Sequence, residues 1–137
     1  MTAIAHPAPS IHGYDHVGIR VSDRAEALEF YGRIGFVLTT EYPDHQALEL
    51  RSNTGVFINL ITNAVRRPGR TNVLYDEPVK FPGTTHPCFI VEDLDTLAAW
   101  LAAEGIAVTE GPIATERRRC LFLRDPDGNV LEYTELR

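Results

Sequence analysis

The sequence repeats itself when it is shifted by 70 positions, and this internal repeat constrains the fold more than any other feature. The matched positions include His16 with His86, Val21 with Val91, Asp23 with Asp93, Gly35 with Gly105 and Thr39 with Thr109. A repeat of this length predicts two copies of one supersecondary unit that bury a common core. Because 137 residues are too few for two full-sized domains, both units are expected in a single domain.

Each half contains the same predicted order of strands around one helix. An alternating apolar and polar run, residues 14–21 or 85–91, predicts the first strand. An aspartate suited to an N-cap and a glycine suited to a C-cap then enclose a stretch with helical spacing of apolar residues. Further strand-like runs follow each glycine, at 36–42, 46–51 and 55–61 in the first half and at 106–109, 118–124 and 129–134 in the second. The prediction is an α+β fold of two tandem βαβββ modules.

The segment boundaries follow from composition. Module one is predicted at about residues 13–62 and module two at about 83–137, within one domain that spans 13–137. The linker of residues 63–82 holds three prolines and a glycine, so it is predicted as irregular chain that is either a simple linker or a lid. Residues 1–12 contain two prolines and are predicted as a flexible tail. The sequence Asp-Pro-Asp-Gly at 125–128 predicts a type I turn before the last strand.

Composition excludes several classes of partner. The net charge is -6, with 19 acidic against 13 basic residues, so a nucleic-acid partner is not expected. The sequence lacks the roughly 20 consecutive apolar residues that span a bilayer, and its N-terminus has no signal-peptide pattern. No membrane partner and a cytoplasmic location are therefore expected. The two cysteines, Cys88 and Cys120, match no metal-ligand spacing and are predicted as reduced thiols.

Polar side chains recur on the predicted strand faces that point away from the helices. Because side chains alternate along a strand, His16 and Arg20 are expected opposite the apolar residues of the first strand. His86 occupies the position of His16 in the second module, and Glu132 has the same orientation on the last strand. Two histidines and one carboxylate from separate strands suit a divalent transition metal with open positions for substrate. Each of these residues taken alone also fits an ordinary solvated or hydrogen-bonded side chain.

These residues carry a resemblance to the vicinal oxygen chelate superfamily, which includes glyoxalase I, extradiol dioxygenases, fosfomycin-resistance proteins, methylmalonyl-CoA epimerase and bleomycin-resistance proteins. The resemblance covers nearly all of residues 14–136, and its most specific motif is Asp-Pro-Asp-Gly-Asn-Val-Leu-Glu at 125–132. It implies that the two modules form a cleft of curved sheet, with metal ligands on the first and last strands of each module. Those ligands fall on His16, His86 and Glu132, and on Asn59, where glyoxalase I has glutamate. A neutral asparagine cannot move a proton as a carboxylate does, so Asn59 is the weakest of the four.

The resemblance also implies a function. The expected protein is a metal-dependent enzyme, a glyoxalase-like lyase or isomerase that acts on a small oxo or hydroxy compound or its thiol adduct. One divalent ion, Ni, Zn, Co, Mn or Fe(II), would bind two neighbouring substrate oxygens, with a metal-bound water or a displaced Glu132 as the base. Arg20 and Asn63 resemble a clamp for a carboxylate of glutathione, and Phe57 and Asn59 are expected to face the cleft. The expected partners are a small-molecule substrate and a second copy of the chain in a homodimer.

Several alternatives remain open at this stage. The same ligands form the facial triad of non-haem Fe(II) enzymes, which allows an extradiol-type dioxygenase, although Phe122 stands where such enzymes carry a tyrosine. A thiol transferase of the fosfomycin-resistance type uses the same ligands. A metal-free binding protein of the bleomycin-resistance type would hold a drug or metabolite in the cleft. Arg20 also fits a cross-strand ion pair, Asn63 a turn, and the linker arginines either attract an anionic substrate or are solvated. The sequence leaves open whether the cleft forms within one chain or across a dimer.

Overall fold

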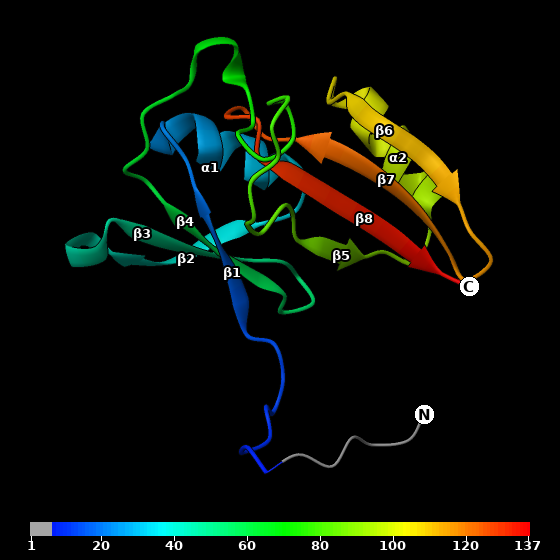
Figure 1. Ribbon diagram of the computed structural model, residues 1–137, viewed down its shortest axis with the longest axis horizontal. Helices are drawn as coiled ribbons and strands as arrows, with labels where there is room; N and C mark the ends of the chain where they lie inside the picture. Colours follow the sequence, from blue (N-terminus) through cyan, green and yellow to red (C-terminus); the bar gives the residue numbers. More distant parts are fainter. Residues whose placement is uncertain (1–6) are drawn as a thin grey trace.

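A computed structural model describes residues 7–137 of the chain (Figure 1). The first module contains β1 (His16–Arg20), α1 (Arg24–Arg33), β2 (Val37–Tyr42), β3 (Ala47–Arg51) and β4 (Phe57–Ile61). The second module contains β5 (Cys88–Ile90), α2 (Leu94–Ala103), β6 (Val108–Ala114), β7 (Arg118–Arg124) and β8 (Val130–Leu136). The predicted α+β fold of two tandem βαβββ modules is confirmed. Of the predicted tail, residues 1–6 lie outside the described residues, and residues 7–12 are exposed.

Each module forms its own four-stranded sheet with the same strand order. The orders are β1-β4-β3-β2 and β5-β8-β7-β6, so the first strand of each module is an edge strand. It pairs in parallel with the last strand of its module, and the other neighbouring strands are antiparallel. The register places Gly18 opposite Asn59 and Cys88 opposite Glu132. The candidate residues of the two modules therefore lie on equivalent strands.

Strand β5 is shorter than the sequence predicted, because it contains Cys88–Ile90 instead of residues 85–91. Pro87 has no backbone N–H and cannot take a regular place in the ladder, so pairing starts after it. The carbonyl of Pro87 still accepts a hydrogen bond of 3.0 Å from the backbone N–H of Glu132. His86 is therefore held beside β8 although it precedes the strand.

Both helices contribute to one hydrophobic core that the two sheets share. In the second module, α2 lies against the sheet of β5 to β8 (Figure 1). The rings of Phe36 and Phe89 meet across the modules, with centroids 5.5 Å apart. Ile58 and Leu60 of β4 are fully buried, so the opposite face of this strand points away from the core. In the described part of the chain, no helix has the length and apolar character needed to cross a membrane.

The turn between β7 and β8 joins the two modules. It closes with a hydrogen bond of 2.9 Å from the Gly128 N–H to the Asp125 carbonyl, which is common in β-turns. The Asp125 carboxylate is buried and accepts a hydrogen bond of 2.8 Å from the Tyr31 hydroxyl of α1. Removal from water raises the pKa of Asp125 above its usual range, although its hydrogen bonds oppose this shift. Asp127 on the same turn accepts a hydrogen bond of 2.8 Å from the backbone N–H of Ser22.

The linker follows a fixed path over this turn. Arg66 pairs with Glu26 of α1 at 2.6 Å and with Asp127 at 3.0 Å. Gly128 has a φ of 83°, and a Cβ atom there would lie 2.3 Å from the carbonyl oxygen of Arg70, so the close approach of the linker requires glycine. The linker arginines are all paired with carboxylates, at 2.6 to 3.3 Å for the nearest atoms of each. Their charge is therefore balanced within the chain.

Candidate functional site

The helix-distal faces of the two sheets carry two clusters of polar and aromatic side chains. The first-module cluster consists of the predicted site residues His16, Arg20, Phe57, Asn59 and Asn63. The second-module cluster consists of the predicted His86 and Glu132 together with Tyr75, Cys88 and Phe122. Sequence reasoning thus identified all members of the first cluster and two of the second as site residues.

His16 lies at the start of β1, where its ring stacks on Phe57 of β4 with centroids 5.1 Å apart. Its Nδ1 atom is 2.8 Å from the carboxylate of Asp15, so Nε2 is the nitrogen that remains for a ligand. Asn59 follows on the same face of β4, and within residues 7–137 its Oδ1 atom is buried without a hydrogen-bond partner. Because an unpaired buried oxygen costs free energy, Asn59 is a candidate contact for a ligand donor or a cation.

Arg20 and Asn63 lie together, as the predicted clamp requires. The Arg20 Nε–H donates to Asn63 Oδ1 at 2.9 Å, and the Asn63 amide donates to Gln46 Oε1 at 3.3 Å. No carboxylate in the described residues forms an ion pair with Arg20, so the cross-strand ion pair considered from the sequence is absent there. The terminal guanidinium nitrogens are consequently available to an anionic group, for which arginine has the matching fork geometry.

His86 and Glu132 are in direct contact in the second module. His86 Nε2 lies 3.0 Å from Glu132 Oε1, and the other carboxylate oxygen accepts a hydrogen bond of 3.1 Å from the Cys88 thiol. The ring of Phe122 contacts His86 edge-on, with centroids 5.3 Å apart. Partial removal from water and the neighbouring carboxylate raise the pKa of the Cys88 thiol to about 12, so the thiol stays protonated at neutral pH. Cys88 is therefore a hydrogen-bond donor to Glu132.

Tyr75 is a member of the second cluster that sequence reasoning missed. It lies in the linker, and its hydroxyl is 2.8 Å from His86 Nδ1. The linker has no counterpart in the internal repeat and no regular periodicity, so neither of the two signals that identified the other residues applies to it. Only the path of the folded chain brings Tyr75 to the site.

A cavity of about 370 Å³ lies between β1, the linker and the start of β8. Residues of both modules and of the linker line it, among them Gly18, Arg20, Asn72, Leu74, His86 and Leu131. This volume is within the range of small-molecule sites, which is about 300–1,000 Å³. Arg20 and His86, which belong to different clusters, thus border one cavity in a single chain.

The two clusters contain donors suited to a divalent cation, but the described part of one chain does not bring three of them together. Among residues 7–137, no three histidine, cysteine, aspartate or glutamate side chains are placed to hold a metal ion. His86 Nε2 and Glu132 Oε1 nevertheless fit the group as a pair. They are a ring nitrogen and a carboxylate oxygen in contact at 3.0 Å, and both are donor types that divalent transition metals accept. Within residues 7–137 of one chain, His16 does not join His86 and Glu132 in such a group.

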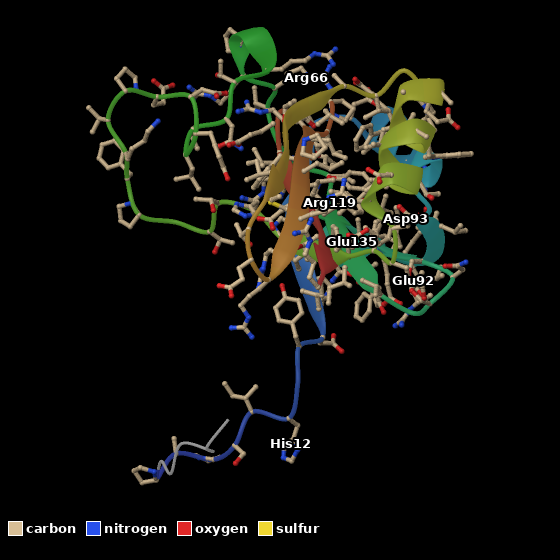
Figure 2. The ribbon with its side chains drawn as sticks, turned by 90° about the vertical axis from the view of Figure 1, so that its right-hand side faces the viewer. His12, Arg66, Glu92, Asp93, Arg119 and Glu135 are labelled. Atoms are coloured by element: carbon tan, nitrogen blue, oxygen red, sulfur yellow. The ribbon has the colours of Figure 1, made fainter. Side chains whose placement is uncertain are left out.

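Other charged residues serve the fold rather than the clusters. Arg119 and Glu135 lie beside the start of α2, which Asp93 caps (Figure 2). Glu135 accepts a hydrogen bond of 2.9 Å from the backbone N–H of Leu94 and lies 3.6 Å from Arg119. These contacts fix the helix to the sheet. His12 lies on the extended N-terminal segment, away from the body of the molecule (Figure 2).

The fold and the paired polar clusters define a tandem βαβββ protein with a candidate small-molecule site. The sequence profile of the Glyoxalase/Bleomycin resistance protein/Dioxygenase superfamily matches residues 13–133, and the chain belongs to this superfamily. The resemblance inferred from the sequence motifs is therefore confirmed.

The chain is similar to several proteins of known sequence or structure. Virulence protein STM3117 of Salmonella typhimurium is 28% identical over 127 residues, which cover 88% of this chain and 82% of that protein. A glyoxalase/dioxygenase from Nostoc punctiforme has a TM-score of 0.74 at 18% identity, covering 100% of this chain and 99% of that chain. TnmS3, an antibiotic binding protein from Streptomyces sp. CB03234, has a TM-score of 0.70 at 24% identity, covering 95% of this chain and 100% of that chain. The two structures support the fold, which a glyoxalase/dioxygenase and a binding protein share.

Proposed function

We propose that the protein is a metal-dependent enzyme of this superfamily, a glyoxalase-like lyase or isomerase that acts on a small oxo or hydroxy compound or its thiol adduct. The observation that carries the proposal is the pair of His86 and Glu132, which brings an imidazole nitrogen and a carboxylate oxygen, both suitable ligands of a divalent ion, within 3.0 Å of each other on the second module. His16, at the equivalent position of the other module, supplies the third donor. Ni, Zn, Co, Mn and Fe(II) are all suited to this donor set.

The residues of the two clusters have distinct roles in this proposal. His16, His86 and Glu132 hold the divalent ion, which as a Lewis acid stabilises negative charge on a substrate oxygen. The free guanidinium nitrogens of Arg20, oriented by Asn63, bind a carboxylate of the substrate. Glu132 is the one carboxylate in the two clusters, and the base that accepts a proton from a substrate carbon would be either Glu132, once displaced from the ion, or a water bound to the ion.

The rings of Phe57 and Phe122 lie against the two histidines and limit the access of water. Asn59 is neutral and cannot accept that proton, so proton transfer relies on a single carboxylate instead of two. Its unpaired Oδ1 atom is left to contact the ion or the substrate.

The proposal requires a second copy of the chain, because His16 does not reach His86 and Glu132 within one chain of described residues 7–137. We propose a homodimer in which the first-module cluster of one copy faces the second-module cluster of the other. Exposed apolar side chains on edge strands of the two sheets support this arrangement, since Val37 of β2 is 66% exposed and Ile90 of β5 is 68% exposed. Covering such side chains favours association.

Metal content tests the first part of the proposal. The purified protein is loaded with Ni, Zn, Co, Mn or Fe(II), dialysed and analysed by elemental mass spectrometry, followed by hemithioacetal, epimerase and catechol-cleavage assays. Wild type should retain one ion per chain, and His86→Ala or Glu132→Ala should lose it. His45→Ala is the matched control, because His45 lies in the exposed turn Pro43–His45 outside both clusters and should leave metal content unchanged. Equal metal content in all variants would refute the ligand assignment.

A mixing experiment tests whether the site is shared between copies. His16→Ala and His86→Ala should each be inactive and metal-free on their own. If the variants are unfolded and refolded together, half of the dimers are mixed, and each mixed dimer has one intact site and one doubly altered site, so about a quarter of wild-type metal binding should return. A site built within one chain would give no recovery at any mixing ratio.

A metal-free binding protein is the second candidate, and the cavity of about 370 Å³ favours it. Arg20 and His86 of one chain both line this cavity, and its walls are formed by protein residues alone. TnmS3, which shares the fold, is described as an antibiotic binding protein. In this case the protein should retain none of the five metals, and a calorimetric screen of small organic anions should find a ligand whose affinity falls in Arg20→Ala.

A further inference from the structure

Tyr75 is presented to His86 by a short, well-anchored segment of the linker, residues 72–76, here called the strap. Asn72 Oδ1 accepts hydrogen bonds from the backbone N–H groups of Leu74 and Tyr75, at 2.9 and 3.1 Å. The carboxylate of Asp76 closes the strap by accepting a hydrogen bond of 2.7 Å from the Asn72 N–H. Local side-chain hydrogen bonds of this kind fix a turn without a helix or strand.

The strap is fixed to the second module at both of its ends. The Asn72 amide donates to the carbonyl of Gly128 at 3.1 Å. Arg124 of β7 donates to the two carboxylate oxygens of Asp76 at 2.6 and 2.9 Å, and its guanidinium lies 5.8 Å from the centre of the Tyr75 ring. A bidentate pair holds geometry better than a single ion pair does. The position of the Tyr75 ring is therefore set by β7 and by the turn before β8.

The consequence is that both ring nitrogens of His86 are engaged. Nδ1 lies 2.8 Å from the Tyr75 hydroxyl, and Nε2 lies 3.0 Å from Glu132. A hydroxyl can either donate or accept, so Tyr75 satisfies Nδ1 whether the ring proton is on Nε2 or on Nδ1. A histidine that binds a cation through Nε2 must carry its proton on Nδ1. Tyr75 can then accept that proton in a hydrogen bond, as the outer partners of metal-bound histidines do.

We propose that Tyr75 is a positioning residue of the second-module cluster, which orients the His86 ring so that Nε2 faces Glu132 and a cation bound there. This inference rests on the proposed function, in which His86 is a metal ligand. Thr85 is the competing partner, because its Oγ1 atom is 2.9 Å from His86 Nδ1. Thr85 is an exposed chain neighbour of His86, and within residues 7–137 its hydroxyl makes no further hydrogen bond that would hold it in place, whereas the strap fixes Tyr75 from a different part of the chain.

The test uses full-length Tyr75→Phe, with two readouts and one matched control. Long-range nitrogen NMR of the metal-free protein reports which nitrogen of His86 carries the proton and whether the other accepts a hydrogen bond, with the resonances assigned from His86→Gln. Titration with Co(II) reports metal affinity and ligand geometry through its visible spectrum. Tyr133→Phe is the control, because within the described residues this buried hydroxyl of the same module has no hydrogen-bond partner.

In wild type, we expect a protonated Nε2 and an Nδ1 that accepts a hydrogen bond. In Tyr75→Phe, the Nδ1 resonance should shift toward that of a free ring nitrogen, and Co(II) affinity should fall about 10-fold or more. Asp76→Asn, which loosens the strap and keeps the ring, should give a smaller shift in the same direction. Tyr133→Phe should change neither readout.

The inference is overturned if Tyr75→Phe matches wild type in both readouts, or if Thr85→Val alone produces the Nδ1 shift. Absence of binding of Co(II), and of Ni, Zn, Mn and Fe(II) as well, to wild type would instead refute the proposed function. In that case an Nδ1 shift confined to Tyr75→Phe would still support Tyr75 as the residue that orients His86, so the two failures are distinguishable.

Discussion

Removal of the Tyr31 hydroxyl tests the buried contact between the modules. Tyr31 is fully buried in α1, and its hydroxyl donates to Asp125 Oδ2 on the turn between β7 and β8. Tyr31→Phe deletes one oxygen and keeps the ring that packs in the core. The remaining donors to the Asp125 carboxylate are the Asn129 amide and two backbone N–H groups, at 2.8 to 2.9 Å. The variant is therefore expected to fold, with an Asp125 carboxylate that has one hydrogen bond fewer.

The expected loss of stability in Tyr31→Phe follows from the negative charge on the Asp125 carboxylate, which accepts the hydrogen bond. A hydrogen bond to a charged group contributes about 1.5–3 kcal/mol to stability. Because Asn129 still donates to the same oxygen, the lower part of this range applies, and Tyr31→Phe should reduce the free energy of unfolding by about 1.5–2 kcal/mol at pH 7. For a chain of this size, that loss corresponds to a decrease in Tm of roughly 5–8 °C.

The loss should also depend on pH in a defined direction. A carboxyl group whose pKa is raised by folding stabilises the fold fully below its unfolded pKa, and this contribution is lost as pH rises through the folded pKa. The pKa of Asp125 is raised from 3.8, chiefly by removal from water, and the Tyr31 hydroxyl opposes that rise. Without the hydroxyl the pKa rises further, so the variant loses more stability at pH 7 than at pH 4. As pH falls toward the unfolded pKa, the difference in the free energy of unfolding between wild type and Tyr31→Phe should decrease toward that of a neutral hydrogen bond, about 1 kcal/mol.

Urea unfolding at several values between pH 4 and pH 7 is the measurement, and Tyr133→Phe is the control. Tyr133 is 5% exposed, and its hydroxyl is buried without a partner among residues 7–137, so its removal should leave stability unchanged or raise it slightly. Equal losses in the two variants, or a Tyr31→Phe loss that does not change with pH, would refute the reasoning.

Two further changes test the path of the linker. In urea unfolding, Gly128→Ala should lower the free energy of unfolding by at least about 2 kcal/mol more than Gly55→Ala does. Both glycines have positive φ, but only at Gly128 would a Cβ atom lie 2.3 Å from the carbonyl oxygen of Arg70. Equal losses would show that the linker moves away freely. Asp76→Asn should cost about 1 kcal/mol at pH 7, as expected of a partly exposed ion pair, and less as pH falls. The reason is that hydrogen bonds from Arg124 lower the pKa of Asp76 from 3.8 to about 2, so its contribution is present above pH 3.8 and lost toward pH 2; a difference that persists at pH 2 would contradict this assignment.

The internal repeat and the alternation of side chains were sufficient to predict the architecture. They paired His16 with His86, and they placed Arg20 and Glu132 on faces away from the core, because both signals depend on local backbone geometry. The predicted start of β5 was wrong, since the alternation of side chains carries no information on hydrogen-bond donors, and Pro87 has no N–H to donate to the neighbouring strand.

The parts of the site that sequence could not provide depend on tertiary arrangement. Alternation assigns a residue to one face of its own sheet and says nothing of how two sheets face each other, so it could not establish whether His16 meets His86 within a chain. Tyr75 lies in irregular chain whose path is determined by Asp76, Arg124 and Gly128 together. Such a path is a property of the folded molecule and has no periodic signal in the sequence.

The turn between β7 and β8 and its counterpart in the first module differ in how many other parts of the chain they contact. The turn between β3 and β4, residues 52–56, is largely exposed and makes its hydrogen bonds within itself. The turn at residues 125–129 contacts α1, the end of β1 and the linker at once. An insertion in the first turn is therefore expected to perturb one hairpin, whereas the same insertion in the second would disturb the contacts of the turn with α1, with the end of β1 and with the strap. Of the two hairpins at equivalent positions in the modules, we therefore expect only the first to tolerate a change in length.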